Sequence, residues 1–247
     1  TELYRRLPEP VEAATEPFWH LIERRAHGEP VAYLTGHREF YGLDFIVTPD
    51  TLIPRPETEF LVTWTVERLR SRRDHVRCVD VGTGCGAIVI AIAATLGPAH
   101  PALLVGCDRS FAALRVARLN RDRLAPGRVH LVCGDLLNWC RGPLDMVVAN
   151  LPYLRPEQWH PSIAFEPPEA LFAPDAGFGL YAELLPQVAE RLATHGAFIF
   201  EIDPAQAERA LTVASQYFPE AAVTVLPDLA GLPRYVTIER KTKSRVS

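Results

Sequence analysis

The amino-acid sequence predicts an α/β fold in which helices cover both faces of a parallel sheet. Two observations indicate this fold. From residue 76 onward, short apolar segments typical of buried strands alternate with segments of helical periodicity. The first apolar segment also runs directly into a turn with three glycines in five residues, within VDVGTGCGAI. Sheets of this kind bind ligands beyond the carboxyl ends of their strands, so this turn is a candidate binding site.

Two shorter segments precede the predicted sheet. Residues 1–30 are charged and helix-prone, and we interpret them as the remnant of an N-terminal helical domain. Residues 31–55 carry two β-prone runs around Gly42, which predicts a β-hairpin linker. A helix is expected after Pro56, because the fixed φ of proline suits a first helical turn, and residues 56–247 form the main domain.

The alternation in the main domain predicts seven strands and four further helices. The strands are expected at 77–81, 103–107, 129–133, 144–149, 197–202, 222–226 and 234–239. The helices are expected near 86–96, 110–124, 180–194 and 204–217.

Composition and charge exclude several classes of protein. Of the 247 residues 48% are hydrophobic, enough for a sizeable core, and the net charge is −4. An acidic balance disfavours a surface built to bind nucleic acid, which needs clustered Lys and Arg. No apolar run approaches the ~20 residues that span a bilayer. We therefore expect no stable nucleic-acid complex and no membrane insertion.

The five cysteines bear on the compartment. Their number is odd, no C-x-x-C pair occurs, and three of them lie in apolar, strand-like runs. We interpret them as reduced thiols packed as small hydrophobic side chains in a cytoplasmic protein. We also expect no metal site and a monomeric chain.

The glycine turn carries an acidic residue that narrows the choice of ligand. Gly82, Gly84 and Gly86 let the backbone turn tightly and approach a ligand closely. Gly82, Gly84 and Ala87 also fit the dinucleotide fingerprint G-x-G-x-x-G/A, which is a weak signal by itself. Asp80, just before the first glycine, would repel a pyrophosphate and attract a cofactor that carries positive charge. S-adenosylmethionine, with an ammonium, a sulfonium and no phosphate, is such a cofactor.

Two more carboxylates follow the next two predicted strands. Asp108 ends the second strand, where it can accept hydrogen bonds from both hydroxyls of a ribose. Asp135 follows the third strand, where it can receive an adenine amino group with Leu136 beside the ring. Each aspartate alone is also typical of a helix N-cap. Three acidic residues at successive strand ends resemble the motif series of class I S-adenosylmethionine-dependent methyltransferases.

The fourth predicted strand ends in the sequence NLPY, residues 150–153. The nitrogen of an amide or an aromatic amine is a poor nucleophile, so an enzyme that methylates it must hold both N–H bonds. The side-chain oxygen of Asn150 and the backbone carbonyl of Leu151 are two acceptors for them, and Pro152 keeps Leu151 extended. Tyr153 can stack on a flat substrate group. The alternative is that this sequence is only the end of a strand followed by an ordinary proline turn.

The motif NLPY resembles the N/D-P-P-Y/F/W motif of methyltransferases that act on amino nitrogens. The stretch GEPVAYLTGHREFYGLDFIVTPDTLIPRPETEFLV is similar to the signature of the release factor glutamine methyltransferases, the HemK/PrmC family. FEPPEAL, FEIDPAQAERA and DLAGLPRYVTIER resemble later blocks of the same family. The similarity therefore covers nearly the whole chain from Leu3 to Arg240.

This resemblance implies a seven-stranded, Rossmann-like methyltransferase domain. It also implies transfer of a methyl group from S-adenosylmethionine, which becomes S-adenosylhomocysteine, to the glutamine side chain in the Gly-Gly-Gln loop of peptide chain release factors. Asn150, Leu151, Pro152 and Tyr153 would hold the substrate amide, and Glu166 would lie in a loop that covers the site. The implied cofactor contacts are Thr58, Asp80, Gly82, Thr83, Gly84, Gly86, Asp108, Asp135, Leu136 and Asn150.

The sequence departs from the family pattern in three places. Leu151 replaces the usual first proline, which keeps the carbonyl but loses rigidity. Asp203 replaces a usual glycine near the end of the fifth strand, and the N-terminal helical segment is shorter than in the family. The proline-rich span from Asn150 to Leu180 is long, and we expect it to form one wall of the glutamine pocket with Tyr153 and Glu166 facing inward.

Three other functions are weighed against this one. An adenine N6-methyltransferase on RNA or DNA would use the same motif, but the acidic balance and the lack of a basic appended domain disfavour it. A binding module that keeps the fold without turnover is disfavoured because all motif residues for the chemistry are present. A nicotinamide dehydrogenase is disfavoured by Asp80 and by the absence of a hydride-site motif.

Overall fold

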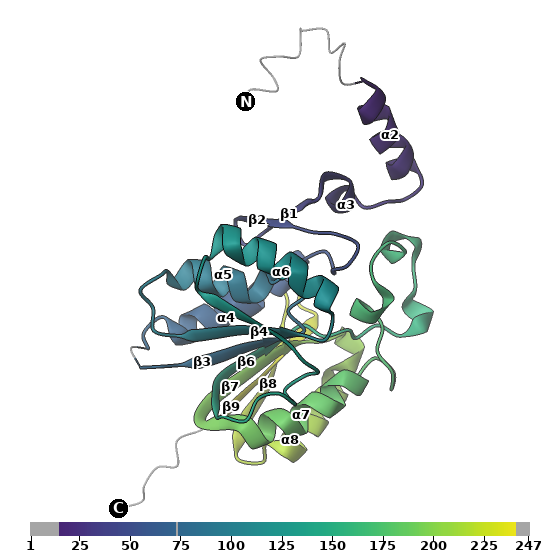
Figure 1. Cartoon of the computed structure of the whole chain (residues 1–247). Helices are drawn as coiled ribbons and strands as arrows, with labels where there is room; N and C mark the ends of the chain where they lie inside the picture. Colours follow the sequence, from purple (N-terminus) through teal and green to yellow (C-terminus); the bar gives the residue numbers. More distant parts are fainter. Residues whose placement is uncertain (1–14, 73, 241–247) are drawn as a thin grey trace, which may run out of the picture.

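Seven strands form one sheet at the centre of the molecule (Figure 1). The structure is a computed structural model and describes residues 15–72 and 74–240. Across the sheet the strand order is β5-β4-β3-β6-β7-β9-β8. The strands are β3 (Arg77–Val81), β4 (Leu103–Asp108), β5 (Val129–Cys133), β6 (Leu144–Ala149), β7 (Leu192–Glu201), β8 (Ala221–Pro227) and β9 (Pro233–Arg240). The α/β fold and its seven strands are therefore confirmed.

The direction of the last strand departs from the parallel sheet that the sequence predicts. β9 runs antiparallel to both of its neighbours, β7 and β8. Only the short turn 228–232 joins β8 to β9, and a turn of that length permits a hairpin but no parallel crossover. As a result, the carboxyl end of β7 lies beside the start of β9, at the edge of the sheet where the other parallel strands also end.

Helices cover both faces of the sheet, as predicted (Figure 1). One face packs on α4 (Glu59–Leu69), α5 (Ala87–Leu96) and α6 (Phe111–Leu124). The other packs on α7 (Gly179–Arg191) and α8 (Ala207–Tyr217). Every residue of α5 from Ala87 to Ala93 is buried, which explains why this helix is apolar on all sides.

The boundary between α7 and β7 is earlier than the sequence indicates. We predicted a helix to residue 194 and a strand from residue 197, whereas α7 ends at Arg191 and β7 begins at Leu192. Leu192 is buried and pairs with Leu144 of β6, ahead of a register shift between Leu144 and Met146. Tertiary pairing thus overrides the helical pattern in this segment.

The N-terminal part comprises α2 (Thr15–Ala26), α3 (Val31–Thr35) and a hairpin of β1 (His37–Phe40) and β2 (Leu43–Ile46). α2 stands clear of the sheet in Figure 1. The predicted turn at Gly42 is confirmed: Tyr41 and Gly42 both have positive φ, 53° and 73°, as in the tight turns that suit twisted strands. Residues 1–14 of the predicted helical segment lie outside the described residues, and the domain limits at 30 and 55 stay predictions.

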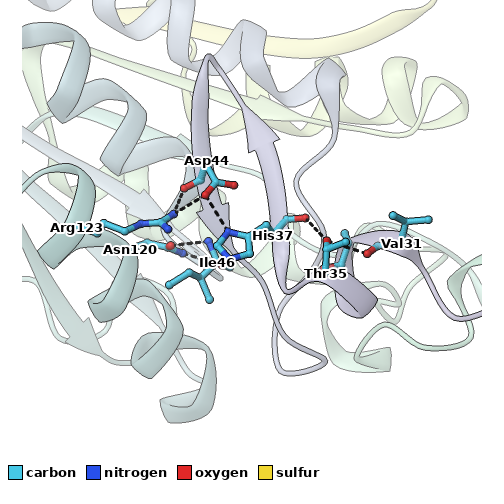
Figure 2. A network of polar contacts seen from close by, with 8 residues as sticks. Val31, Thr35, His37, Asp44, Ile46, Asn120 and Arg123 are labelled. Atoms are coloured by element: carbon cyan, nitrogen blue, oxygen red, sulfur yellow. Dashed lines mark hydrogen bonds and ion pairs between the residues drawn. The ribbon is translucent and has the colours of Figure 1, made fainter. Parts of the chain in front are cut away.

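Polar contacts fasten the hairpin to α6 (Figure 2). The Asn120 side chain accepts a hydrogen bond from the Ile46 amide and donates one to the Ile46 carbonyl, at 2.8 and 2.9 Å. Arg123 pairs with Asp44, which also contacts His37 at 2.8 Å. Asn120 is fully buried, and its side chain satisfies the backbone amide and carbonyl of Ile46. It thus takes the place of the further strand that the edge of β2 lacks.

The long span after β6 is ordered by short 3-10 turns. These are η2 (Pro156–Gln158), η3 (Pro161–Ile163) and η4 (Pro168–Ala170); two similar turns, η1 (Pro56–Thr58) and η5 (Pro204–Gln206), precede α4 and α8. Asp203 caps η5 by accepting from the Ala205 amide, and its other oxygen accepts from the Gln158 side chain at 3.0 Å. The departure at position 203 therefore ties the long span to the end of β7.

All five cysteines are free thiols, four of them buried and Cys133 exposed. Among the described residues, no helix is both long and apolar enough to cross a membrane.

Candidate active site

A cleft of about 790 Å³, some of it open to solvent, lies at the carboxyl ends of β3, β4 and β6. This is the edge at which open α/β sheets bind their ligands. Most of the residues that the sequence analysis assigned to the cofactor or the substrate line it. They are Gly82, Gly84, Asp108, Asp135, Leu136, Asn150, Leu151 and Pro152.

The glycine turn forms the floor of the cleft. Gly82 and Gly84 have φ of 75° and 56°, a conformation that side chains rarely adopt. A Cβ atom on Gly82 would lie 2.6 Å from Cδ2 of Leu151, so Leu151 of the NLPY motif packs directly on the turn. Gly86, by contrast, does not line the cleft. It is the N-cap residue that precedes α5, and a Cβ there would lie 2.5 Å from Cδ1 of Ile90.

Asp80 lies beneath the glycine turn rather than in the cleft. Its side chain is fully buried, and its Oδ2 accepts a 2.6 Å hydrogen bond from the hydroxyl of Thr83. Its Oδ1 has no hydrogen-bond partner within the described part of the chain. Burial raises the pKa of Asp80 to about 7, against the hydrogen bond from Thr83. A buried carboxylate with an unpaired oxygen is a group that a nearby cation would stabilise.

Asp108 reaches the cleft from the end of β4. Its Oδ2 accepts from the Gly84 amide and its Oδ1 from the Ser110 amide, both at 2.8 Å. Burial raises the pKa of Asp108, while these backbone hydrogen bonds oppose the shift. The carboxylate is thus oriented by two loops, which leaves it with lone pairs for a ligand on the cleft side.

Asp135 and Leu136 form the far wall of the cleft. Asp135 is exposed, and Leu136 is buried with a φ of +46°. Positive φ in a branched residue is strained, and such strain concentrates at ligand sites. Both residues therefore lie where an adenine-sized ring has an acceptor at its edge and an apolar side chain against its face.

A second cavity of about 410 Å³ adjoins the first. Asn150, Leu151 and Pro152 line both cavities, and the other residues of the second are apolar apart from Arg55 and Tyr153. The long span supplies much of its wall, through Leu154, Ile163, Ala170 and Leu171. The span thus supplies a wall of this cavity beside Asn150, and Tyr153 lines it as well. Its assignment as the glutamine pocket stays a prediction.

Glu166 does not face either cavity. It is 3% exposed, pairs with the Arg55 guanidinium, and accepts a 3.0 Å hydrogen bond from the Ile53 amide. The inward orientation that the sequence suggested is therefore replaced by a clamp between the long span and residues 53–55. This clamp holds together two segments that line the cavities.

A chain of hydrogen bonds runs behind Asn150. Its Nδ2 donates to Oγ1 of Thr58 at 2.9 Å, and that hydroxyl donates to Oε2 of Glu201 at 2.8 Å. The hydroxyl of Tyr153 donates to the other oxygen, Oε1, at 3.0 Å. Thr58 and Glu201 are buried and line neither cavity, so Thr58 contacts Asn150 instead of the cleft.

Comparison with known proteins agrees with this geometry. The family described as "Methyltransferase domain" matches residues 72–212, and the family described as "PrmC N-terminal domain" matches residues 1–36. The chain is 39% identical to the release factor glutamine methyltransferase of Koribacter versatilis over 228 residues, which cover 90% of this chain and 78% of the relative. It is 40% identical to the one of Moorella thermoacetica, over 90% of this chain and 79% of the relative.

The chain belongs to the release factor glutamine methyltransferase family.

Solved structures place this methyltransferase in a wider fold group. A methyltransferase of Pyrococcus furiosus superposes with a TM-score of 0.60 at 15% identity, over 90% of this chain and 99% of that one. A 16S ribosomal RNA methyltransferase of Thermus thermophilus, solved with AdoMet and guanosine, superposes with a TM-score of 0.58 at 17% identity, over 83% of this chain and 50% of that one. At such identities the likeness concerns the fold alone.

Two residues of this methyltransferase site were not assigned from the sequence. Glu201 ends a buried strand, and a charged residue at the end of an apolar run is the signal that could have singled it out. Gln206 is buried and donates to the carbonyls of Tyr153 and Ala176, at 3.1 and 3.2 Å. Its role depends on a contact 53 residues away in the chain, which no local pattern reveals.

Proposed function

We propose that this chain transfers a methyl group from S-adenosylmethionine to the side-chain nitrogen of the glutamine in the Gly-Gly-Gln loop of a peptide chain release factor. The observation that carries the proposal is the position of Asn150 and Leu151, which line both cavities. Two acceptors at that junction suit a primary amide, which presents two N–H donors. The names of the relatives supply the kind of protein that offers such an amide.

The residues of the first cavity fit S-adenosylmethionine. Asp108 offers lone pairs for the ribose, and Asp135 and Leu136 offer an acceptor and an apolar face for the adenine. The unpaired Oδ1 of Asp80 beneath the turn favours a cationic group above it, through the loop amides. When bound, this cofactor supplies a methyl group that its sulfonium already activates.

The second cavity fits the glutamine side chain. The aliphatic part of the side chain would contact Leu52, Ile163 and Leu171, and the amide would reach Oδ1 of Asn150 and the Leu151 carbonyl. No described residue donates a hydrogen bond to either oxygen. Holding the nitrogen in line at about 3–3.5 Å from the methyl carbon can supply several kcal/mol of the barrier.

This cavity offers no general base. The described residues that line it include no His, Cys, Lys, Asp or Glu. We infer that the amide proton leaves to water after transfer, because the methylated amide is strongly acidic until it does. Positioning by Asn150, Leu151 and Tyr153 is then the main contribution of the chain. We further propose a monomeric, cytoplasmic enzyme that forms no stable complex with nucleic acid.

Methyl-labelled S-adenosylmethionine and a purified release factor test this function. We expect label in the release factor and none in a matched release factor whose loop glutamine is replaced by alanine. Ribosomal RNA and a DNA duplex belong in the same experiment, because an adenine N6-methyltransferase would label them. Label in nucleic acid, or equal label in both release factors, would contradict the proposal.

A further inference from the structure

The hydrogen bonds behind Asn150 all donate in one direction, from Asn150 to Thr58 and from Thr58 to Glu201. The buried carboxylate of Glu201 sets this direction. An ionised carboxylate can only accept hydrogen bonds. Glu201 is 1% exposed and receives a hydroxyl on each oxygen, Thr58 at 2.8 Å and Tyr153 at 3.0 Å. Burial raises the pKa of Glu201, and these two hydrogen bonds oppose that shift because they stabilise the ionised carboxylate.

The direction is passed on by Thr58. Its single hydroxyl proton is used on Glu201, so toward Asn150 it can present only a lone pair. The Asn150 amide must then turn its NH₂ group toward Thr58, where the separation is 2.9 Å. Its oxygen is consequently left on the opposite side of the amide, available to a substrate N–H.

The backbone of the motif is held from the same place. The Glu201 carbonyl accepts a 2.5 Å hydrogen bond from the Tyr181 hydroxyl, and the oxygen of Tyr181 accepts one from the Leu151 amide at 3.0 Å. Tyr181 is fully buried, so these contacts are shielded from water. One residue at the end of β7 thus orients the side chains of Asn150 and Tyr153 and, through Tyr181, the peptide before the Leu151 carbonyl.

We propose that Glu201 is a positioning residue that acts through Thr58 to fix that the oxygen of the Asn150 amide, and not its NH₂ group, meets the substrate. The proposal rests on the function proposed above and deepens it. Glu201 itself lines neither cavity, so it acts on the reaction only through the residues that it orients.

Loss of the Glu201 carboxylate should reverse the donor and acceptor roles along these hydrogen bonds. With Glu201→Gln, the new amide can keep its oxygen on Tyr153 and present its NH₂ to Thr58. The Thr58 hydroxyl then donates to Asn150, whose amide flips and turns its NH₂ toward the substrate donors. Adding Asn150→Asp to this variant restores an acceptor at the cavity, because a carboxylate can accept from Thr58 and from the substrate at once.

The test is a double-variant cycle of Glu201→Gln and Asn150→Asp, read as the single-turnover methylation rate at saturating cofactor. We expect Glu201→Gln to lower the rate about tenfold or more, the range expected when a buried group loses its partner. The double variant should be faster than Glu201→Gln, although Asn150→Asp alone should be slower than the unaltered enzyme. Calorimetric affinity for S-adenosylhomocysteine should stay within about twofold in Glu201→Gln, because Glu201 does not line the first cavity.

The matched control is Glu239→Gln, on the neighbouring strand, which pairs with Arg68 on the surface. It should retain the unaltered rate. The proposal is overturned if Glu201→Gln methylates at the rate of the control, or if adding Asn150→Asp slows it further. Failure of the proposed function differs from both, since the unaltered enzyme itself would then leave the release factor unlabelled.

A second pair of variants covers the case in which Glu201→Gln does not fold. Thr58→Ser keeps the hydroxyl and should keep the direction of the chain, whereas Thr58→Val is of similar size and breaks it. We expect the valine variant to be about tenfold slower than the serine variant. Equal rates for the two would overturn the proposal.

Discussion

At the scale of single residues, the site separates groups that touch a ligand from groups that orient them. Asn150 has the most direct role in the proposed function, because it lines both cavities. Asp80, in contrast, is enclosed beneath the glycine turn with Thr83 as its hydrogen-bond donor. The two residues lead to different predictions, one about turnover and one about stability.

Asn150→Ala removes one of two acceptors and lets the substrate amide rotate. The methylation rate should fall about a hundredfold or more, as when a positioned polar group is removed from other active sites. Affinity for the cofactor should change little, because Asp108, Asp135 and Leu136 keep its pocket. Single-turnover methylation measures the first quantity and calorimetry the second. A rate close to that of the unaltered enzyme would contradict the role given to NLPY.

The Asp80 carboxyl should make the stability of the free protein depend on pH. Its pKa is raised to about 7, so between its ordinary value of 3.8 and about 7 the folded chain holds a proton that the unfolded chain releases. The free energy of unfolding should therefore fall as pH rises through this window. Denaturant unfolding at about pH 5.5 and about pH 7.5 measures the slope.

Asp80→Asn is the control for this prediction, because its side chain is neutral at every pH. The slope should flatten in this variant, although Asp108 and Glu201, whose pKa values are also raised by burial, keep part of it. An unchanged slope would assign the effect to other groups.

The limits of sequence reasoning are clearest at this scale. Gly82, Gly84, Asp108 and Leu136 were found because each lies at the end of a strand or within three residues of it, and the apolar pattern of these strands is local. Thr58 was assigned to the cofactor by family resemblance, and the structure brings it against Asn150 and Glu201 instead. Those partners are 92 and 143 residues away in the chain, so no spacing rule connects them.

At the scale of elements, the glycine turn between β3 and α5 must fit beneath the NLPY segment. Cδ2 of Leu151 lies 2.6 Å from the position that a Cβ on Gly82 would take. The two segments are therefore matched in size, and the loss of rigidity expected from this departure is offset by burial of the leucine, which is 4% exposed.

Gly82→Ala should destabilise the protein more than Gly36→Ala. Both glycines have a φ of 75°, so both variants carry a backbone strain of about 1–3 kcal/mol. Only at Gly82 would the new methyl group also clash, because nothing lies within 4 Å at Gly36. Denaturant unfolding compares the two, and calorimetry should show weaker cofactor binding for Gly82→Ala alone. Equal losses would mean that the turn adapts freely.

The order of elements was more predictable than their directions and ends. Six of the seven strands begin within one residue of their predicted starts, because short apolar runs mark buried strands. β7 begins five residues before its predicted start, since its first pairing is made by Leu192 within a segment that reads as helix. The antiparallel direction of β9 follows from the short turn 228–232 that joins it to β8. An apolar pattern predicts that a strand exists but not in which direction it runs.

At the scale of the whole molecule, the hairpin is part of the main core. Phe40 and Phe45 are 1% and 0% exposed and contact each other edge to face, with ring centroids 6.0 Å apart. They belong to the same buried cluster as Leu61 of α4 and Ile90 of α5. α2, in contrast, is exposed along most of its described length. The N-terminal part thus contributes to the stability of the molecule through the hairpin.

Phe45→Ala and Phe18→Ala should therefore differ sharply in their effect on folding. Phe45 is fully buried, and its removal should lower the free energy of unfolding by about 3–5 kcal/mol through lost burial and the cavity left behind. Phe18 in α2 is 53% exposed, and its removal should change the same quantity by about 0.5 kcal/mol or less. Denaturant unfolding of both variants measures the difference. If Phe45→Ala unfolds like the unaltered chain, the hairpin is a separable linker. A large loss of unfolding free energy would place the hairpin within the methyltransferase core, because Phe45 shares a buried cluster with residues of α4 and α5.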